Sequence, residues 1–159
     1  MAMNIKAKKI TVENFASFGK VVVSTSGNPT SQAADYKFWS DIMNYKIDGE
    51  TEVGICTVYK QPSNSIYGME RHLNTPEILI PIDAPFILPL LNDKGKPEEA
   101  EAFVVDIGQA IRINESVWHG ACVPFGKDEC SYFVIFKRGT PHNDVEKTDL
   151  PEIIISSLQ

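Results

Sequence analysis

The sequence lacks any run of lysine or arginine, and acidic residues outnumber basic ones. Lysine and arginine total 15 against 21 aspartates and glutamates, which gives a formal net charge of −6 and a pI near 5.0. A nucleic-acid-binding surface needs clustered basic residues, so we do not expect a nucleic-acid partner. A small anionic substrate is compatible with this composition where a local basic group meets it.

Cysteine is scarce as well, with three residues at Cys56, Cys122 and Cys130. Their number is odd and none forms a CxxC pair, which argues against a disulfide framework and against a zinc finger. We therefore expect reduced cysteines that behave as small apolar residues, as in a cytoplasmic protein.

Long hydrophobic runs are missing too. No apolar stretch approaches the roughly 20 residues that a membrane-spanning helix needs, because Pro81, Asp83, Pro85 and Pro89 interrupt the most apolar region, 78–91. The first residues are not followed by the apolar segment of a signal peptide. We expect a cytoplasmic protein without a membrane partner. A length of 159 residues with 43% hydrophobic content fits a single domain over 1–159.

Short runs of β-branched and aromatic residues, separated by turn residues, cover most of the chain. Thr11 can cap a short helix over 11–18, and Gly19 can end it in the left-handed conformation. The later runs recur about every 8–12 residues, which favours an all-β sandwich or barrel over an α/β fold. The expected strands are 21–23, 36–39, 44–47, 53–59, 77–82, 86–91, 102–105, 110–113, 118–123 and 132–137.

Two of the three histidines lie in segments, 70–77 and 118–119, that bring other chemical groups with them. The first segment contains two carboxylates and a guanidinium beside its imidazole. Residues two apart in a strand face the same side, so Glu70 and His72 share a face if the segment is extended. The same alternation turns Arg71 to the other face unless a bulge re-aims it.

The second segment resembles the second motif of the cupin superfamily. That motif is a glycine, five residues, proline-x-glycine, two residues and a histidine. Gly108 and His119 hold its spacing, while Asn114 and Ser116 stand in place of the proline and the second glycine. The resemblance implies an all-β, cupin-type double-stranded β-helix, or jelly-roll barrel, that carries His119 on one of its strands.

The first segment resembles the first cupin motif, which is His-x-His, three or four residues and a glutamate. His72 and Glu77 match it, and Glu70 stands in place of the first histidine. The resemblance implies that these three residues and His119 point into one barrel. Two carboxylates and two imidazoles could bind a divalent metal such as Mn, Fe, Ni or Zn. They could instead transfer protons without a cofactor.

Most of the chain resembles the ureidoglycolate lyase family, also named ureidoglycolate hydrolase, of the cupin superfamily. Its pieces appear in order at 13–19, 70–72, 80–81, 102–103, 117–119, 138–139 and 144–146. The resemblance implies a homodimeric enzyme of allantoin catabolism, within purine metabolism, that splits ureidoglycolate into glyoxylate and urea.

This reaction implies a base for the carbinol hydroxyl, an acid for the departing urea nitrogen and a cation for the substrate carboxylate. His119 and His72 are the candidates for proton transfer, because imidazole titrates near neutral pH. Glu70 is the candidate to orient an imidazole or to bind the urea NH groups. Arg71 is the candidate carboxylate clamp, because its fork matches a carboxylate, and Lys137 is the alternative.

The sequence departs from the family at three places. Asn114, a candidate substrate-binding residue, stands where the family has a histidine; Lys137 replaces an acidic residue, and Glu77 replaces a frequent glutamine. These departures leave two alternatives open. One is a metal-dependent cupin of another class, such as a sugar isomerase or a dioxygenase. The other is a non-catalytic cupin that binds a small molecule.

Overall fold

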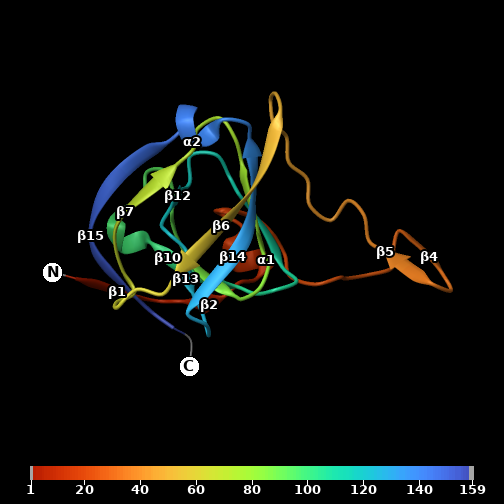
Figure 1. Cartoon of the computed structure of the whole chain (residues 1–159), viewed down its shortest axis with the longest axis horizontal. Helices are drawn as coiled ribbons and strands as arrows, with labels where there is room; N and C mark the ends of the chain where they lie inside the picture. Colours follow the sequence, from red (N-terminus) through yellow and green to blue (C-terminus); the bar gives the residue numbers. More distant parts are fainter. Residues whose placement is uncertain (1, 158–159) are drawn as a thin grey trace.

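The computed structural model describes residues 2–157 as two stacked β-sheets and a hairpin that projects from them (Figure 1). In spatial order, the larger sheet contains β1 (Met3–Lys6), β15 (Glu146–Ser156), β7 (Ser65–Arg71), β12 (Trp118–His119), β9 (Phe86–Leu91), β10 (Glu101–Val105) and β2 (Lys8–Lys9), and β13 (Val123–Pro124) also pairs with β9. The smaller sheet contains β3 (Gly19–Val22), β11 (Ala110–Ile113), β8 (Glu77–Pro81), β14 (Glu129–Lys137) and β6 (Thr51–Tyr59). The hairpin pairs β4 (Ser31–Ala33) with β5 (Tyr36–Phe38), and the helical segments are α1 (Val12–Phe15), α2 (Thr140–Asn143) and a 3-10 turn at Pro97–Glu99. No helix of this described part is long and apolar enough to cross a membrane.

The strand order of the two sheets is that of a jelly roll. If β6 to β12 and then β14 are counted as one to eight along the chain, the smaller sheet contains 1-8-3-6 and the larger sheet 2-7-4-5. Every connection except the one from the fourth to the fifth strand therefore crosses between the sheets. This double winding is the arrangement of jelly rolls, including the cupins. The prediction of an all-β, cupin-type barrel with a short N-terminal helix is confirmed.

Most expected strands are present, with two differences. Strands β9 and β11 have the predicted bounds, whereas 44–47 forms no strand. There the Asn44 carbonyl accepts a hydrogen bond from the Arg112 guanidinium instead of from a neighbouring strand. The expected strand 118–123 is divided into β12 and β13 at Gly120, whose amide donates to the Pro89 carbonyl.

Gly19 has a different structural role from the one that the sequence predicts. Thr11 caps α1 as predicted, because its hydroxyl accepts from the Asn14 amide and the Asn14 side chain accepts from the Thr11 amide. The helix ends before Gly19, which instead begins β3. A Cβ at Gly19 would lie 1.8 Å from the Arg112 carbonyl oxygen. Glycine is required there because β3 and β11 approach closely, and not because a helix ends in the left-handed region.

Strand β9 is buried on both faces, and its packing holds the backbone of the neighbouring strand β12 in place. Phe86, Leu88 and Leu90 belong to the core between the sheets, whereas Ile87 and Leu91 belong to a second core on the other face of the larger sheet. The short strand β12 lies between β9 and β7 in that sheet. Close packing of both cores around β9 therefore holds the β12 backbone in one position.

Candidate functional site

A cavity of about 440 Å³ lies between the two sheets. Strand alternation determines which side chains line this cavity, because every second residue of a strand faces the same side. Most of the lining is apolar, and the polar groups among it include Glu70, His72, Glu77 and His119. The structure therefore brings together the four groups that the cupin resemblance implies. The alternate lining residues are Glu52, Gly54, Cys56 and Val58 on β6, and Tyr132, Val134 and Phe136 on β14.

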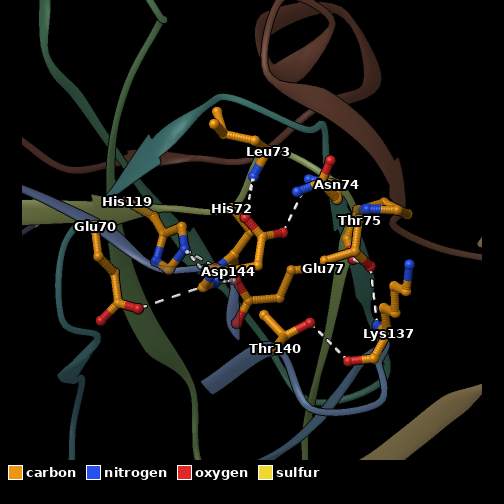
Figure 2. A network of polar contacts seen from close by, with 11 residues as sticks. Glu70, His72, Leu73, Asn74, Thr75, Glu77, His119, Lys137, Thr140 and Asp144 are labelled. Atoms are coloured by element: carbon orange, nitrogen blue, oxygen red, sulfur yellow. Dashed lines mark hydrogen bonds and ion pairs between the residues drawn. The ribbon is translucent and has the colours of Figure 1, made fainter. Parts of the chain in front are cut away.

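Figure 2 shows the two imidazoles between the two carboxylates, with Glu70 on one side and Glu77 on the other. Glu77 Oε2 lies 2.9 Å from His119 Nε2 and 3.3 Å from His72 Nε2. The two Nε2 atoms are 3.3 Å apart, and Glu70 Oε2 lies 3.9 Å from that of His72. Glu77 and both imidazoles are largely buried, whereas Glu70 has 42% of its side chain exposed. The two imidazoles are thus shared by two sets of three ligand atoms, one completed by Glu77 and the other by Glu70.

Local backbone contacts fix the His72 ring. Its Nδ1–H donates to the Asp144 carbonyl at 2.7 Å, which leaves Nε2 of the neutral ring without a hydrogen. The Asp144 carboxylate accepts from the backbone amides of Leu73 and Asn74 at 3.0 and 2.9 Å. The Ser116 amide donates to the His72 carbonyl at 2.8 Å. Ser116 has a φ of 68°, a left-handed conformation that glycine, the residue of the cupin motif at this position, can adopt without strain.

The charges in this cluster depend on each other. Burial lowers the pKa of His72, but the Glu77 carboxylate, the Asp144 carbonyl and the Glu70 charge outweigh burial and raise it above its ordinary value. Burial raises the pKa of Glu77, but His119 and His72 outweigh burial and hold it well below the usual range. A buried carboxylate of this kind needs a positive partner, which is either an imidazolium or a bound cation.

The donor set fits a divalent metal. Metal–nitrogen and metal–oxygen bonds of about 2.1 Å place neighbouring ligand atoms about 3.0 to 3.4 Å apart. Three separations among His72, His119 and Glu77 are 2.9, 3.3 and 3.3 Å. Glu77 Oε2 is buried and receives no hydrogen bond of good geometry from residues 2–157, although both Nε2 atoms are near. Glu70, His72 and His119 also form a group of ligand atoms within 4.8 Å of one another.

Comparison with known proteins places the chain in a family. A sequence profile of ureidoglycolate lyases matches residues 2–156. The chain belongs to the ureidoglycolate lyase family. A ureidoglycolate lyase of Chelativorans sp. (strain BNC1) is 28% identical over 156 residues, which cover 93% of each chain. Ureidoglycolate lyase 2 of Rhizobium meliloti (strain 1021) is 36% identical over 73 residues, or 45% of this chain and 44% of that protein. Among solved structures, Bacillus subtilis oxalate decarboxylase aligns with a TM-score of 0.47 and 17% identity over 64% of this chain and 24% of that chain.

In this member of the ureidoglycolate lyase family, Arg71 does not face the cavity. Its guanidinium forms ion pairs with Asp93 and, at 3.1 Å, with Glu146, and it lies 4.3 Å from the ring centre of Trp118. The strand β7 carries no bulge at this position, so alternation turns Arg71 away from Glu70 and His72. The expectation that Arg71 clamps a substrate carboxylate does not fit this placement.

Lys137 and Asn114, the other two candidate substrate ligands, also lie outside the cavity lining. On β14, Tyr132, Val134 and Phe136 face inward, so Lys137 has the opposite parity, and its amide donates to the Thr75 hydroxyl. The Asn114 side chain accepts from Arg112 at the end of β11. Neither placement offers a contact with a substrate inside the barrel.

The sequence predicts reduced cysteines that behave as small apolar residues, but it does not predict which of them line the cavity. Cys122 and Tyr132 line it, and burial raises the pKa of both groups far above the ordinary range. All three cysteines are free, and burial raises the pKa of Cys130 to about 11. Cys122 and Tyr132 therefore form a neutral part of the cavity wall, and the Cys122 thiol supplies no nucleophile at neutral pH, because the thiolate is the reactive form.

Proposed function

We propose that the protein cleaves ureidoglycolate into glyoxylate and urea. The observation that carries this proposal is the cluster of His72, His119, Glu77 and Glu70 at one apolar cavity, in a chain that matches its family over nearly its whole length. An enclosed site that combines a partly exposed carboxylate with buried imidazoles suits proton transfer to and from a small polar substrate.

The reaction needs one proton to leave an oxygen and one to reach a nitrogen. The carbinol O–H proton passes to a base, the carbinol carbon and oxygen form the aldehyde of glyoxylate, and the C–N bond breaks. The nitrogen keeps the electron pair of that bond and takes a proton, which gives urea. Glu70 is suited to accept the carbinol proton, because it is the carboxylate at the mouth of the cavity and has 42% of its side chain exposed.

His72, His119 and Glu77 are suited to a fixed role beside Glu70. The Asp144 carbonyl holds the His72 ring, and the strand pairing of β12 holds His119. These residues, with Glu70 nearby, would hold a divalent metal, which acts when bound as a Lewis acid toward a substrate oxygen. Without a metal, the protonated imidazole that balances Glu77 supplies the acid for the urea nitrogen, as the sequence predicts.

The direct test is to incubate the purified protein with ureidoglycolate and to measure glyoxylate and urea together. We expect equal amounts of both products, at a rate far above the spontaneous decay measured in buffer. Samples treated with a chelator and then supplied with Mn, Ni or Zn distinguish the metal-bound site from the metal-free site. Activity that is lost with the chelator and restored by a metal supports the metal-bound site. A rate no higher than the spontaneous one, with every metal, would exclude this substrate.

We also propose that the protein is a cytoplasmic homodimer. Its hairpin β4–β5 projects from the barrel (Figure 1), with Tyr36 49% and Phe38 55% exposed. A two-stranded hairpin is marginally stable alone, so a second copy of the chain is the partner that we expect to cover these rings. Free cysteines support a reducing compartment.

Light scattering tests the dimer. We expect twice the chain mass of 17.7 kDa for the wild-type protein and a shift toward monomer for Phe38→Ser. The control is Val12→Ser, because Val12 is similarly exposed, at 51%, but lies on α1 of the barrel. A wild-type monomer at every concentration, or equal behaviour of the two variants, would contradict the proposed interface.

A further inference from the structure

The cavity has no positive side chain of its own other than its histidines. Its lining, within residues 2–157, includes the carboxylates of Glu52, Glu70 and Glu77 but no lysine and no arginine. A substrate with a carboxylate would meet negative charge there unless a cation stood near the mouth. Because Arg71 and Lys137 face away, a lysine or arginine that binds the substrate carboxylate must come from another part of the fold.

A shallow groove continues outward from this cavity. The two share Glu70, Pro141 and Val145, so the groove opens directly into the mouth beside the converging ligand atoms. It lies where β15 runs alongside β7 beneath α2 (Figure 1). The groove is lined by Glu70, Pro141, His142, Asn143, Val145 and Lys147.

The strand register directs Lys147 toward this mouth. In the antiparallel pair of β15 with β7, Lys147 lies directly opposite Glu70, and Glu146 lies opposite Arg71. Directly opposed residues project from the same face of a sheet. The ion pair of Arg71 with Glu146 marks the outer face, so Lys147 and Glu70 share the face of the cavity.

The Lys147 ammonium is available for a ligand. Its side chain is exposed, and no carboxylate of the described chain lies within 4.0 Å of its nitrogen. Glu70, its cross-strand neighbour, turns toward His72 instead. Lys147 is the one lysine or arginine that lines either the cavity or its groove within residues 2–157.

We propose that Lys147 binds the carboxylate of the substrate at the mouth of the cavity, and so selects 2-ureido acids over neutral ureas. This inference rests on the proposed function and assigns the cation that the reaction needs. The carboxylate lies on the groove side of Glu70, and the carbon that carries the hydroxyl and urea groups lies next to the Glu70 carboxylate.

The binding test uses two ligands that cannot react, because both lack the carbinol hydroxyl. Ureidoacetate carries the carboxylate, and ureidoacetamide replaces it with a neutral amide. We expect wild-type protein to bind ureidoacetate on the order of 10- to 100-fold more tightly than the amide, as measured by calorimetry. Lys147→Met should remove most of this preference, and Lys147→Arg should keep part of it. Lys137→Met should keep all of it.

The kinetic test uses ureidoglycolate with the same variants. Lys147→Met should raise KM by about 10-fold or more and leave kcat within about threefold, because the carboxylate that the lysine binds keeps its charge and its bonds during the reaction. A Lys147→Met protein with the full preference for ureidoacetate, or a wild-type protein with none, would overturn the assignment. If wild-type protein shows the preference but releases no glyoxylate, the anion site stands and the proposed reaction fails.

Discussion

His119→Ala should abolish glyoxylate release, with kcat/KM lower by about 10²- to 10⁴-fold. The His119 Nε2 atom lies 2.9 Å from Glu77 Oε2 and 3.3 Å from His72 Nε2. If the site holds a metal, the substitution removes one of its three close ligand atoms. If the site works without a metal, the substitution removes one of the two imidazoles that transfer protons. It also leaves the buried Glu77 carboxylate with a single positive partner. Steady-state kinetics on the purified variant measure the loss, and a thermal melt shows whether the barrel still folds.

The matched control for this loss is Asn114→Ala. Both residues belong to the second cupin motif, but Asn114 lies outside the cavity and contacts Arg112. We expect its activity to stay within about threefold of the wild-type value. A folded His119→Ala protein with more than a tenth of wild-type activity would show that the imidazole is not part of the reaction. Equal losses in both variants would indicate a structural role of the motif instead.

The barrel could be predicted because its signals are local. Short runs of apolar, β-branched and aromatic residues, separated by turn residues, recur along the chain, and these runs place β9 and β11 at their observed bounds. The interpretation of Gly19 as a helix end was wrong, because its requirement comes from Arg112 on a strand far along the chain. The expected strand at 44–47 was also wrong, since the partner of Asn44 is a side chain and not another strand. Contacts of this kind are fixed by the tertiary fold.

The site was predictable to the extent that it depends on alternation. Glu70 and His72 share the cavity face, and Arg71 points away from it, as the period of two requires. The register between distant strands has no such signal. The position of Lys147 opposite Glu70 depends on how β15 pairs with β7, and the hydrogen bond from His72 to the Asp144 carbonyl depends on a backbone group. A sequence pattern gives neither the pairing register of distant strands nor the positions of backbone groups, so neither arrangement could be predicted from it.

Glu77→Gln should lower the affinity of the cluster for a divalent metal and weaken the cluster itself, while the side chain keeps its size. The Glu77 carboxylate is the group that draws both imidazoles together, and it is buried with 10% of its side chain exposed. An amide oxygen is a much weaker metal ligand than a carboxylate, so we expect divalent metal affinity to fall by at least about 100-fold. Metal content after dialysis against Mn, Ni or Zn measures this change. A variant that retains stoichiometric metal would show that Glu77 is not a ligand.

The same substitution should reverse the contribution of His72 to the pH dependence of stability in metal-free protein. In the wild-type protein burial lowers the pKa of His72, but Glu77, the Asp144 carbonyl and Glu70 together outweigh burial and raise it. At pH values between the pKa of His72 in the unfolded protein and its higher pKa in the folded protein, the folded protein binds more protons. The contribution of His72 to stability therefore falls as pH rises through the pKa of the folded protein. Without the carboxylate, burial dominates and lowers this pKa. The His72 contribution to stability should then rise with pH below about 6.5, with a slope of at most about 1.4 kcal/mol per pH unit.

Chemical denaturation of chelator-treated protein at several pH values tests this reversal, and NMR titration of the histidines follows the His72 pKa directly. The control is Glu70→Gln, because Glu70 is the more distant and more exposed carboxylate, with its Oε2 3.9 Å from His72 Nε2. It should change the slope far less, since an exposed charge is screened by solvent. If Glu77→Gln and Glu70→Gln have equal slopes, the two carboxylates act on His72 equally, and Glu77 is not the dominant partner of that imidazole.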